Sequence, residues 1–482
     1  MGVSLKGDVA IKSALTPMQK ALKINLNTII YGSFSEIGAG QETARNFFRA
    51  GASSGTIAKA MSAYSKEFSD AIYGREDDGR YVTKKRLKKM LRHEINLLEA
   101  RLDHNEYPDR IFFSYANTVA TIDFSKKNKG HGWVGVRFQL NPLEDYNEII
   151  LHVRFHENDA KHQQETLGIM GVNLIYGAFY HHDNPKDLLV SLYDNIDKDK
   201  IEIDMINFSG PRFAFVDNRL MSLLLVKNGF TDAVMFGPDG YNLLPADELY
   251  KKNILALRGS FRPVTKLALD MLEKGLQAFK QEKDVNPDKI DLILEMTLDN
   301  LSNDCGMINE KDFLDRVKLL SSLNQMVMVT NFREYYRLSE YFSRFSKERM
   351  GLIIGTNHLI KLFDEEYYKD LSGGILEAMG KLFNKKIKLY IYPYKGRKTN
   401  KIISSKDVKL EKKKLQDLFD YFRHDGKFED IEGYNPDLLD TYTREIIQKI
   451  QKGEKDWEDL LPEGIATEVK KNYLFGFRKS DK

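Results

Sequence analysis

The segment RGSFRP carries the residue types best suited to holding an anion. Two arginines, Arg258 and Arg262, flank Ser260 after the apolar run NILAL, and Pro263 suits the first turn of a helix. Guanidinium groups and helix amino ends both attract phosphate and carboxylate. The carboxyl end of a strand is also where α/β folds hold their ligands. The segment therefore predicts an anion site; the alternative is that both arginines pair with carboxylates of the chain, such as Asp217.

Four further polar residues stand at positions where such folds bind ligands. Asp217 and Arg219 come at the start of an expected helix, where an aspartate also serves as N-cap. Glu295 and Asn331 lie at or just beyond the ends of expected strands. We treat all four as candidate ligand-binding residues, and capping of a helix or loop is the alternative for each.

Histidines gather between residues 152 and 182. His152 and His156 are four apart on an expected strand and share a face, and His182 stands beside Asp183. Imidazoles and a carboxylate are ligands for zinc or iron, but this spacing matches no known metal signature. The sequence therefore predicts no metal site, and it indicates no particular cofactor.

The stretch YGSFSEIGAGQ has an apolar start, a loop of small residues and then the first residue of an expected helix. Gly32, Phe34 and Gly40 match in register the first signature of the nicotinate-nucleotide adenylyltransferases, which reads G-x-F-x-P-x-H-x-G-H. Gly38 and Gln41 replace the two histidines of that signature. The stretch therefore resembles a degenerate nucleotide loop of this family.

Two other positions bear on this resemblance. Glu36 stands where the family has proline, and ISSKDVK, from Ile403 to Lys409, is similar to the start of the family's late I-S-S-T-x-x-R signature. Because the family's histidines stabilise charge on the transferred phosphoryl group, the resemblance implies a binding-only relative. The alternative is an ordinary strand-to-helix turn, in which Gly38 and Gly40 allow tight backbone geometry.

The whole chain also resembles a group of uncharacterised bacterial proteins of similar length. Some of these carry automatic labels as nicotinate-nucleotide adenylyltransferases or as TonB-dependent receptors. The loop signature accounts for the first label, and no residue pattern supports the second. The resemblance implies no established activity.

Composition places the chain among globular proteins. It has 482 residues, 42% hydrophobic and 30% charged, with a net charge of +3. So small a net charge argues against nucleic acid as a partner, although lysines and alternating tyrosines crowd residues 381–415. A single cysteine, Cys305, excludes an internal disulfide framework and fits the cytoplasm.

The sequence also bears on membranes and partners. The first residues contain no secretory h-region, and no window holds about 18 apolar residues, so we expect a cytoplasmic protein that does not associate with membranes. Its 24 tyrosines and 28 phenylalanines leave a homo-oligomer open.

The periodicity predicts an α/β protein in four segments. Residues 1–108 are expected to be mostly helical, including a helix over 54–74, and residues 109–158 alternate as in an antiparallel meander. Residues 159–395 alternate short apolar runs with amphipathic helices, as buried parallel strands do, and 396–482 form a basic linker and helical tail. Seven apolar runs allow an open doubly wound sheet, which we expect, or a (β/α)8-like barrel.

These patterns predict binding of a phosphorylated or otherwise anionic metabolite at the ends of strands. The chain contains no complete catalytic signature, so the sequence leaves open whether it is an enzyme. A non-catalytic, self-assembling scaffold is the alternative function, because the chain is long and rich in aromatic residues.

Overall fold

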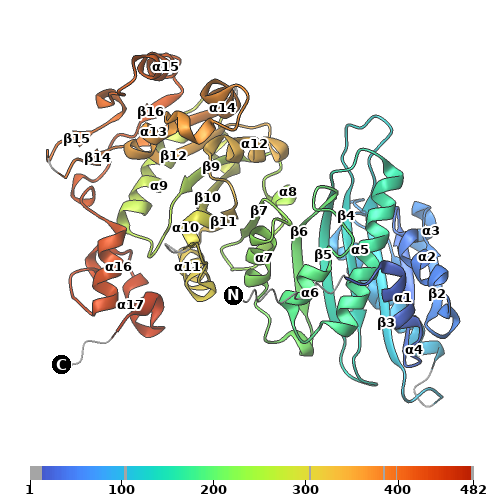
Figure 1. The fold of residues 1–482 in the computed structure, drawn as a ribbon. Coiled ribbons are helices and arrows are strands. Elements are labelled where there is room, and N and C mark those ends of the chain that lie inside the picture. The colour runs from blue at the N-terminus through green and yellow to red at the C-terminus, as the bar shows by residue number, and fades with distance from the viewer. Residues whose placement is uncertain (1–13, 103–105, 303–305, 384–385, 398, 479–482) are drawn as a thin grey trace, which may run out of the picture. The chain divides into compact units, whose positions relative to one another are not determined.

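The structure is a computed structural model, and it describes residues 14–102, 106–302, 306–383, 386–397 and 399–478. Cys305 and the first 13 residues, on which two inferences above rest, lie outside the described residues. Contacts divide the chain into two compact units, unit 1 (residues 1–231) and unit 2 (residues 232–482). Each unit is built on its own sheet with helices around it (Figure 1).

Unit 1 contains a six-stranded mixed sheet with the order β2-β1-β3-β4-β5-β6. Strand β1 runs parallel to both β2 and β3, and the pairs from β3 to β6 are antiparallel. The expected meander is confirmed as β3, β4 and β5, and it forms the middle of this larger sheet. The strands are β1 (Ile30–Ile37), β2 (Ile57–Ser62), β3 (Ile111–Ala120), β4 (His131–Phe138), β5 (Asn147–Phe155) and β6 (Ile201–Ser209).

Two parts of this sheet differ from the sequence prediction. The helix expected over 54–74 is instead strand β2 followed by helix α3, because the run IAKAMS alternates burial along a sheet edge while its small alanines fit either period. Strand β6 was expected among the parallel strands, but it is an antiparallel edge strand beside β5. Strands from three of the four predicted segments therefore pair in one sheet.

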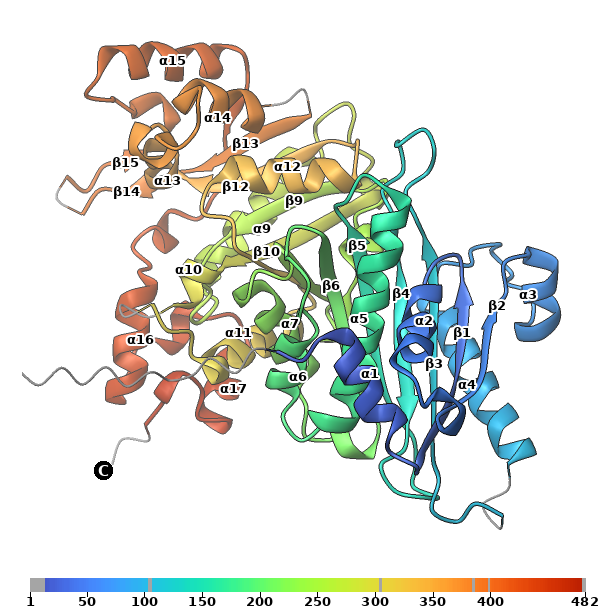
Figure 2. The same ribbon diagram turned by 45° about the vertical axis from the view of Figure 1, so that its right-hand side comes forward.

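Helices cover both faces of the sheet in unit 1. Helices α1, α2 and α5 bury apolar residues in the main core on one face, and Figure 2 shows α5 in front of the strands. Helix α4 packs on the other face, where Ile95 and Leu98 contact Phe112. The helices are α1 (Pro17–Asn25), α2 (Gln41–Ala50), α3 (Lys66–Tyr73), α4 (Lys84–Arg101), α5 (Ala160–Tyr180), α6 (Pro185–Ser191) and α7 (Asn218–Lys227).

Two glycines of α5 allow this helix to lie close against α2. A Cβ added at Gly168 would be 2.5 Å from the Cβ of Glu42, and one added at Gly171 would be 2.3 Å from Oγ1 of Thr43. Any larger residue at either position would push the two helices apart. The first turn of α2 is therefore held against α5.

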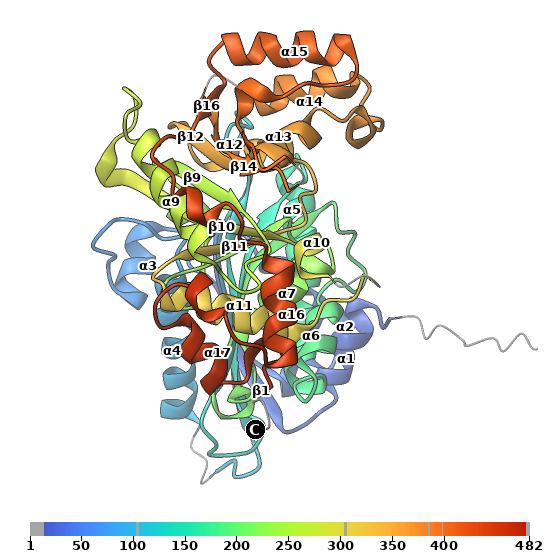
Figure 3. The same cartoon turned by 90° about the vertical axis from the view of Figure 1, so that its left-hand side faces the viewer.

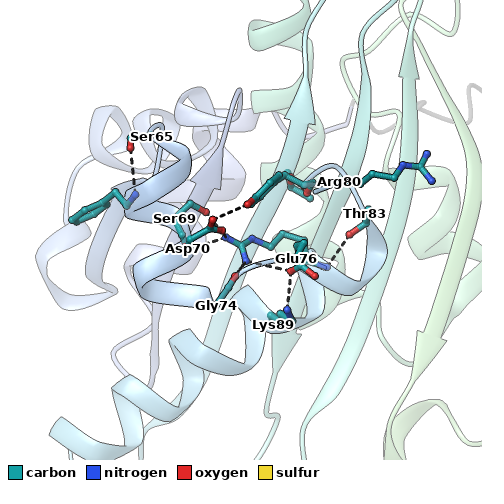
Figure 4. A network of polar contacts seen from close by, with 12 residues as sticks. Ser65, Ser69, Asp70, Gly74, Glu76, Arg80, Thr83 and Lys89 are labelled. Atoms are coloured by element: carbon teal, nitrogen blue, oxygen red, sulfur yellow. Dashed lines mark hydrogen bonds and ion pairs between the residues drawn. The ribbon is translucent and has the colours of Figure 1, made fainter. Parts of the chain in front are cut away.

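A buried cluster of charges joins α3 to α4 (Figure 4). The guanidinium of Arg86, fully buried on α4, donates to the carbonyl and hydroxyl of Ser69 at 2.8 and 2.6 Å and to Glu76 at 3.2 Å. Lys89 also donates to Glu76, at 2.9 Å, and Figure 4 shows Ser69, Asp70, Glu76 and Lys89 converging. Because buried charges are costly without partners, this cluster holds α3 against α4.

Unit 2 contains an eight-stranded sheet with the order β16-β13-β12-β9-β10-β11-β7-β8. Its neighbouring strands pair in parallel except in the pairs β11–β7 and β7–β8, which are antiparallel. The expected open, mostly parallel sheet is confirmed, and the barrel alternative is not found, since β16 and β8 form two edges. The strands are β7 (Ala233–Phe236), β8 (Asn242–Leu243), β9 (Asn253–Arg258), β10 (Ile290–Thr297), β11 (Met326–Thr330), β12 (Met350–Gly355), β13 (Ile387–Tyr392) and β16 (Phe428–Asp430).

The order of the parallel strands reverses between β9 and β12. The chain adds β10 and β11 on one side of β9, and it then crosses back to add β12, β13 and β16 on the other side. A separate hairpin pairs β14 (Tyr394–Lys395) with β15 (Ile402–Ile403). In doubly wound folds, such a reversal opens a crevice at the carboxyl ends of the two strands where it occurs. In this sheet those two strands are β9 and β12.

Helices lie on both faces of this sheet as well. On one face Phe279 of α9 contacts Tyr390 with ring centroids 5.8 Å apart, and α12 and α14 contribute to the core on the other face. Figure 3 shows α14 and α15 side by side. The helices are α8 (Pro245–Glu248), α9 (Lys266–Phe279), α10 (Leu298–Leu301), α11 (Glu310–Ser322), α12 (Tyr335–Phe345), α13 (Thr356–Leu362), α14 (Gly374–Leu382), α15 (Lys413–His424), α16 (Thr443–Lys452) and α17 (Ile465–Lys471).

Within the described ranges, none of these helices has the length and apolar character needed to cross a bilayer.

Candidate functional site

The centre of the candidate site in unit 2 is an ion pair between Arg258 and Glu295. Arg258 is the last residue of β9, Glu295 lies two residues before the end of β10, and the two are register partners on these neighbouring parallel strands. The Nε and Nη2 atoms of Arg258 donate to the two carboxylate oxygens of Glu295 at 2.7 and 2.9 Å. Thr330 donates to the same carboxylate at 2.6 Å. Since Glu295 is fully buried, this pair fixes the guanidinium at the carboxyl end of β9.

The loop after β9 is fastened by a second group of charges. Arg262 donates to Asp312 at 2.6 Å, and Arg316 of α11 donates to the other oxygen of that carboxylate. Arg316 also donates to the backbone carbonyl of Ser260 at 2.9 Å. Two guanidiniums thus share one carboxylate, which leaves the loop with an excess of one positive charge.

A histidine and a tyrosine complete the surroundings of Arg258. The guanidinium carbon of Arg258 lies over the ring of Tyr335, 4.3 Å from the centroid of that ring. His358 lies on α13 just after β12, and desolvation together with the charges of Lys361 and Arg258 lowers its pKa. Its imidazole is therefore neutral near pH 7, when it both donates and accepts a hydrogen bond.

The backbone of the loop is strained at one residue. Phe261 is buried and has a φ of +45°, a region that bulky residues rarely adopt. A Cβ added at Gly259 would lie 2.9 Å from the ring of Phe261, so the loop curls tightly on itself. Strain of this kind collects at ligand-binding and catalytic sites.

The other sequence candidates lie elsewhere. Asp217 and Arg219 belong to unit 1, where Asp217 is the N-cap of α7 and accepts from Arg219 at 2.6 Å. Asn331 turns toward the start of β7 and donates to Asp232 at 3.2 Å. Of the predicted residues, the structure thus brings Arg258 and Glu295 together, with Ser260 and Arg262 in the adjoining loop. The predicted pairing of the arginines with chain carboxylates is found, with Glu295 and Asp312 as partners instead of Asp217.

Sequence reasoning missed His358, Tyr335 and Arg316 at this site. His358 follows the apolar run MGLIIG, and its position becomes informative only when β12 is known to neighbour β9. Arg316 lies inside an amphipathic helix, where an arginine gives no signal of its own.

The glycine-rich loop of unit 1 is a tight turn from β1 into α2. Gly38 and Gly40 have φ values of +87° and +135°, and a Cβ added at Gly38 would lie 1.8 Å from the carbonyl oxygen of Val119. Phe34 is buried in the core, and the side chain of Gln41 donates back to the carbonyl of Gly38 at 3.3 Å. The geometry explains why glycines occupy this turn.

Two positions along β1, Gly32 and Glu36, precede this turn. A Cβ added at Gly32 would lie 2.3 Å from the ring of Phe113, so this position also requires glycine. Glu36 is buried, its carboxylate accepts from Ser62 at 3.2 Å, and its second oxygen has no hydrogen-bond partner among the described residues. Burial, with a contribution from the charge of Glu42, raises the pKa of Glu36 to about 7. Near the end of β1 the chain therefore has an ionisable acid, at the position where the nucleotidyltransferase signature has proline.

The histidines of unit 1 form a polar chain. Nδ1 of His152 lies 2.5 Å from Asp204, and Nε2 of the same ring lies 3.3 Å from His131. His156 lies 3.7 Å from Glu202. Over the described ranges, no group of three or more His, Cys, Asp and Glu side chains is arranged to hold a metal ion.

Comparison with known proteins adds little to this geometry. The chain matches no protein-family model and no curated protein. Among solved structures it is similar to a competence-damaged protein (CinA) superfamily protein from Enterobacter cloacae, with 12% identity over 37% of this chain and 98% of that chain and a TM-score of 0.27. The competence/damage inducible protein CihA from Agrobacterium tumefaciens is similar over the same shares, with 14% identity and a TM-score of 0.24. Scores this low establish no shared function.

Proposed function

We propose that the chain is a cytoplasmic protein that binds a phosphorylated or otherwise anionic metabolite at the carboxyl ends of β9, β10 and β12. The observation that carries the proposal is the reversal of strand order between β9 and β12, with Arg258 at the end of the first of these strands. Doubly wound sheets bind ligands in the crevice that such a reversal creates.

The charges around the crevice support an anion. The pair of Arg258 and Glu295 is neutral overall, whereas Arg262, Arg316 and Asp312 together carry one excess positive charge. Arg262 is the most accessible of these guanidiniums, with 40% of its side chain exposed. It can turn to an incoming anion while Arg316 continues to neutralise Asp312. In this arrangement Arg258 stays paired with Glu295, and Arg262 is the arginine that moves to contact the anion.

The experiment is a thermal-stability screen of the full chain against nucleoside monophosphates, sugar phosphates and inorganic pyrophosphate. A ligand that binds the folded state raises the melting temperature in proportion to the logarithm of its concentration. Arg262→Gln should abolish the shift, and Arg344→Gln, a similarly exposed arginine at the far end of α12, should leave it unchanged. An equal shift in both variants would refute the assignment.

The degenerate nucleotidyltransferase relationship is a separate part of the proposal. It rests on Gly32, Phe34 and Gly40 in unit 1 and on the ISSKDVK segment in unit 2. With Gly38 and Gln41 in place of the histidines, the relative would bind a nucleotide without transferring an adenylyl group. A nucleotide that stabilises the chain and is not turned over would support this relationship.

One observation favours the rival function, a self-assembling scaffold. Large apolar side chains spaced three or four residues apart are exposed on α1 and on the residues that flank it, namely Leu15, Met18, Leu22 and Leu26. Such a stripe is typical of helices that contact another subunit. Native mass spectrometry tests it: assemblies that dissociate in the Met18→Glu and Leu22→Glu variants would favour the scaffold, and a monomer would exclude it.

A further inference from the structure

Strand β2 is the last strand of the sheet in unit 1, and its outer side pairs with no other strand of the described ranges. Its neighbour in the sheet is β1, and Figures 1 and 2 show β2 as the outermost strand. Ala60 and Ser62 of this strand are exposed, and Met61 between them is half-buried. An open edge of this kind presents backbone N–H and C=O groups to any strand that fits beside it.

The pairing with β1 shows which residues of β2 turn their backbone groups outward. Ala63, directly after β2, donates its N–H to the carbonyl oxygen of Glu36 at 2.9 Å. Because successive residues of a strand turn their N–H and C=O groups to opposite sides, Met61 also faces β1, and Ala60 and Ser62 face the open side. The register with β1 is regular over these three residues, so the outward groups keep ordinary strand geometry.

The usual protection of an edge strand is weak in β2. Edge strands are commonly kept apart from other strands by free charges or by proline. The single charged residue in β2 is Lys59, and its Nζ lies 2.8 Å from the buried carboxylate of Glu94, so its charge is already paired. The strand contains no proline, and Tyr64, just beyond its end, is an aromatic residue with 77% of its surface exposed. This edge is therefore suited to receive another strand.

The side chains along this edge fit a second copy of the same strand. In an antiparallel pair centred on Met61, Ala60 lies opposite Ser62 of the second copy, and the two methionines lie opposite each other. The alanine–serine pairs are then the hydrogen-bonded positions, and the methionines occupy a non-hydrogen-bonded position with Cα atoms about 4.5 Å apart. Lys59 lies opposite Ala63, so the two lysines do not face each other. Small side chains meet on one face and flexible methionines on the other, without a like-charge pair.

We propose that β2 pairs antiparallel with β2 of a second copy of this chain, across a twofold axis at Met61, so that two six-stranded sheets become one. About four backbone hydrogen bonds form, two in each pair of Ala60 with Ser62. A strand pair alone buries less area than a stable dimer needs, and the exposed Tyr64 and Phe68 beyond the strand end add apolar area. The pairing uses residues of unit 1 and is independent of the anion site proposed in unit 2.

The first test places a cysteine on the twofold axis of the full chain. In a Cys305→Ser background, which leaves the introduced thiol as the single one, Met61→Cys should form a disulfide-linked dimer on mild oxidation. The reason is that Cα atoms about 4.5 Å apart lie within the range that a disulfide spans. Lys66→Cys, exposed at the start of α3, is the control and should crosslink at least about tenfold more slowly. Equal crosslinking rates for the two cysteines would overturn the proposal.

The second test is analytical ultracentrifugation of the unmodified chain and of two edge variants. Ala60→Pro removes an outward N–H that the pairing with β1 does not use, and Met61→Lys places two lysines opposite each other. The unmodified chain should dimerise with a dissociation constant on the order of 10 μM, and each variant should weaken dimerisation about tenfold or more. Met18→Glu should leave it unchanged, which separates this pairing from self-assembly through α1. A monomer at about 100 μM would overturn the proposal and leave the edge to an extended segment of a different protein.

Discussion

Glu36 and Asn117 occupy paired positions on the parallel strands β1 and β3, and both side chains keep polar atoms without partners. The second oxygen of Glu36 and both amide atoms of Asn117 are buried and make no hydrogen bond to any described residue. They lie where β1 turns into α2, and a Cβ added at Gly40 would be 1.9 Å from the amide nitrogen of Asn117. An acid in such surroundings resists ionisation, and this has a consequence for stability.

The first prediction concerns pH. The folded pKa of Glu36 is about 7 against an ordinary value of 4.5, so the folded state binds more protons between these values and stability falls as pH rises through this window. Above pH 7 the accumulated loss reaches roughly 3 kcal/mol. Glu36→Gln should remove this slope and be the more stable protein at pH 8. Urea unfolding at a series of pH values measures the slope of stability against pH, and Glu67→Gln, at an exposed position, is the control. A free energy of unfolding that falls with pH to the same extent in Glu36→Gln and in the unmodified chain would contradict the prediction.

The second prediction concerns the ion pair of the unit 2 crevice. Glu295→Ala leaves Arg258 with 10% of its side chain exposed and no carboxylate, which should cost about 3–5 kcal/mol of unfolding free energy. The double variant Arg258→Met, Glu295→Leu should recover more than half of this loss, because no charge is then buried alone. Denaturant titration of the three proteins gives both values. A single variant that costs less than about 1 kcal/mol would show the pair to be unimportant for stability.

The third prediction concerns the turn after β1. Gly38→Ala places a Cβ 1.8 Å from the backbone oxygen of Val119 at a φ of +87°, so the clash adds to the conformational strain. The cost should be about 3–5 kcal/mol. Gly229→Ala also has a positive φ, of +67°, but no atom within 4 Å, and it should lose only about 1–2 kcal/mol. Comparable melting temperatures for the two variants would mean that the turn relaxes to accept a side chain.

The fourth prediction concerns the charge cluster between α3 and α4. Arg86→Met removes a fully buried guanidinium from Glu76 and Ser69 and should cost about 3 kcal/mol. The loss should be local, with faster amide hydrogen exchange across α3. Lys85→Met, with 64% of its side chain exposed, should change stability by less than about 1 kcal/mol. Protection of α3 that is unchanged in Arg86→Met would exclude the cluster as the anchor.

The sequence was most informative where strands are buried on both faces. NILAL, DLILEMTL and MGLIIG are mostly apolar runs, and they form β9, β10 and β12 of the parallel sheet. It was least informative at edges: β2 has only one buried residue, Ile57, and its short pattern fits a helix equally well. Edge strands owe their conformation to a neighbour, which a local pattern does not contain.

The candidate site residues show the same difference between what a local pattern contains and what depends on neighbouring strands. Arg258 and Glu295 could be placed at strand ends from the sequence, but their pairing depends on β9 lying beside β10 in one register. His358 lies near Arg258 only because β12 joins the other side of β9. No signal in the sequence indicated that Glu36 is buried, because carboxyl groups are usually exposed to solvent.

The chain passes between its two units once, after Thr231. Every strand of the six-stranded sheet is encoded before that point, and every strand of the eight-stranded sheet after it. During synthesis, unit 1 can therefore complete its sheet while the ribosome is still translating unit 2. At the level of the gene, one recombination event at this junction is enough to join the two halves or to part them.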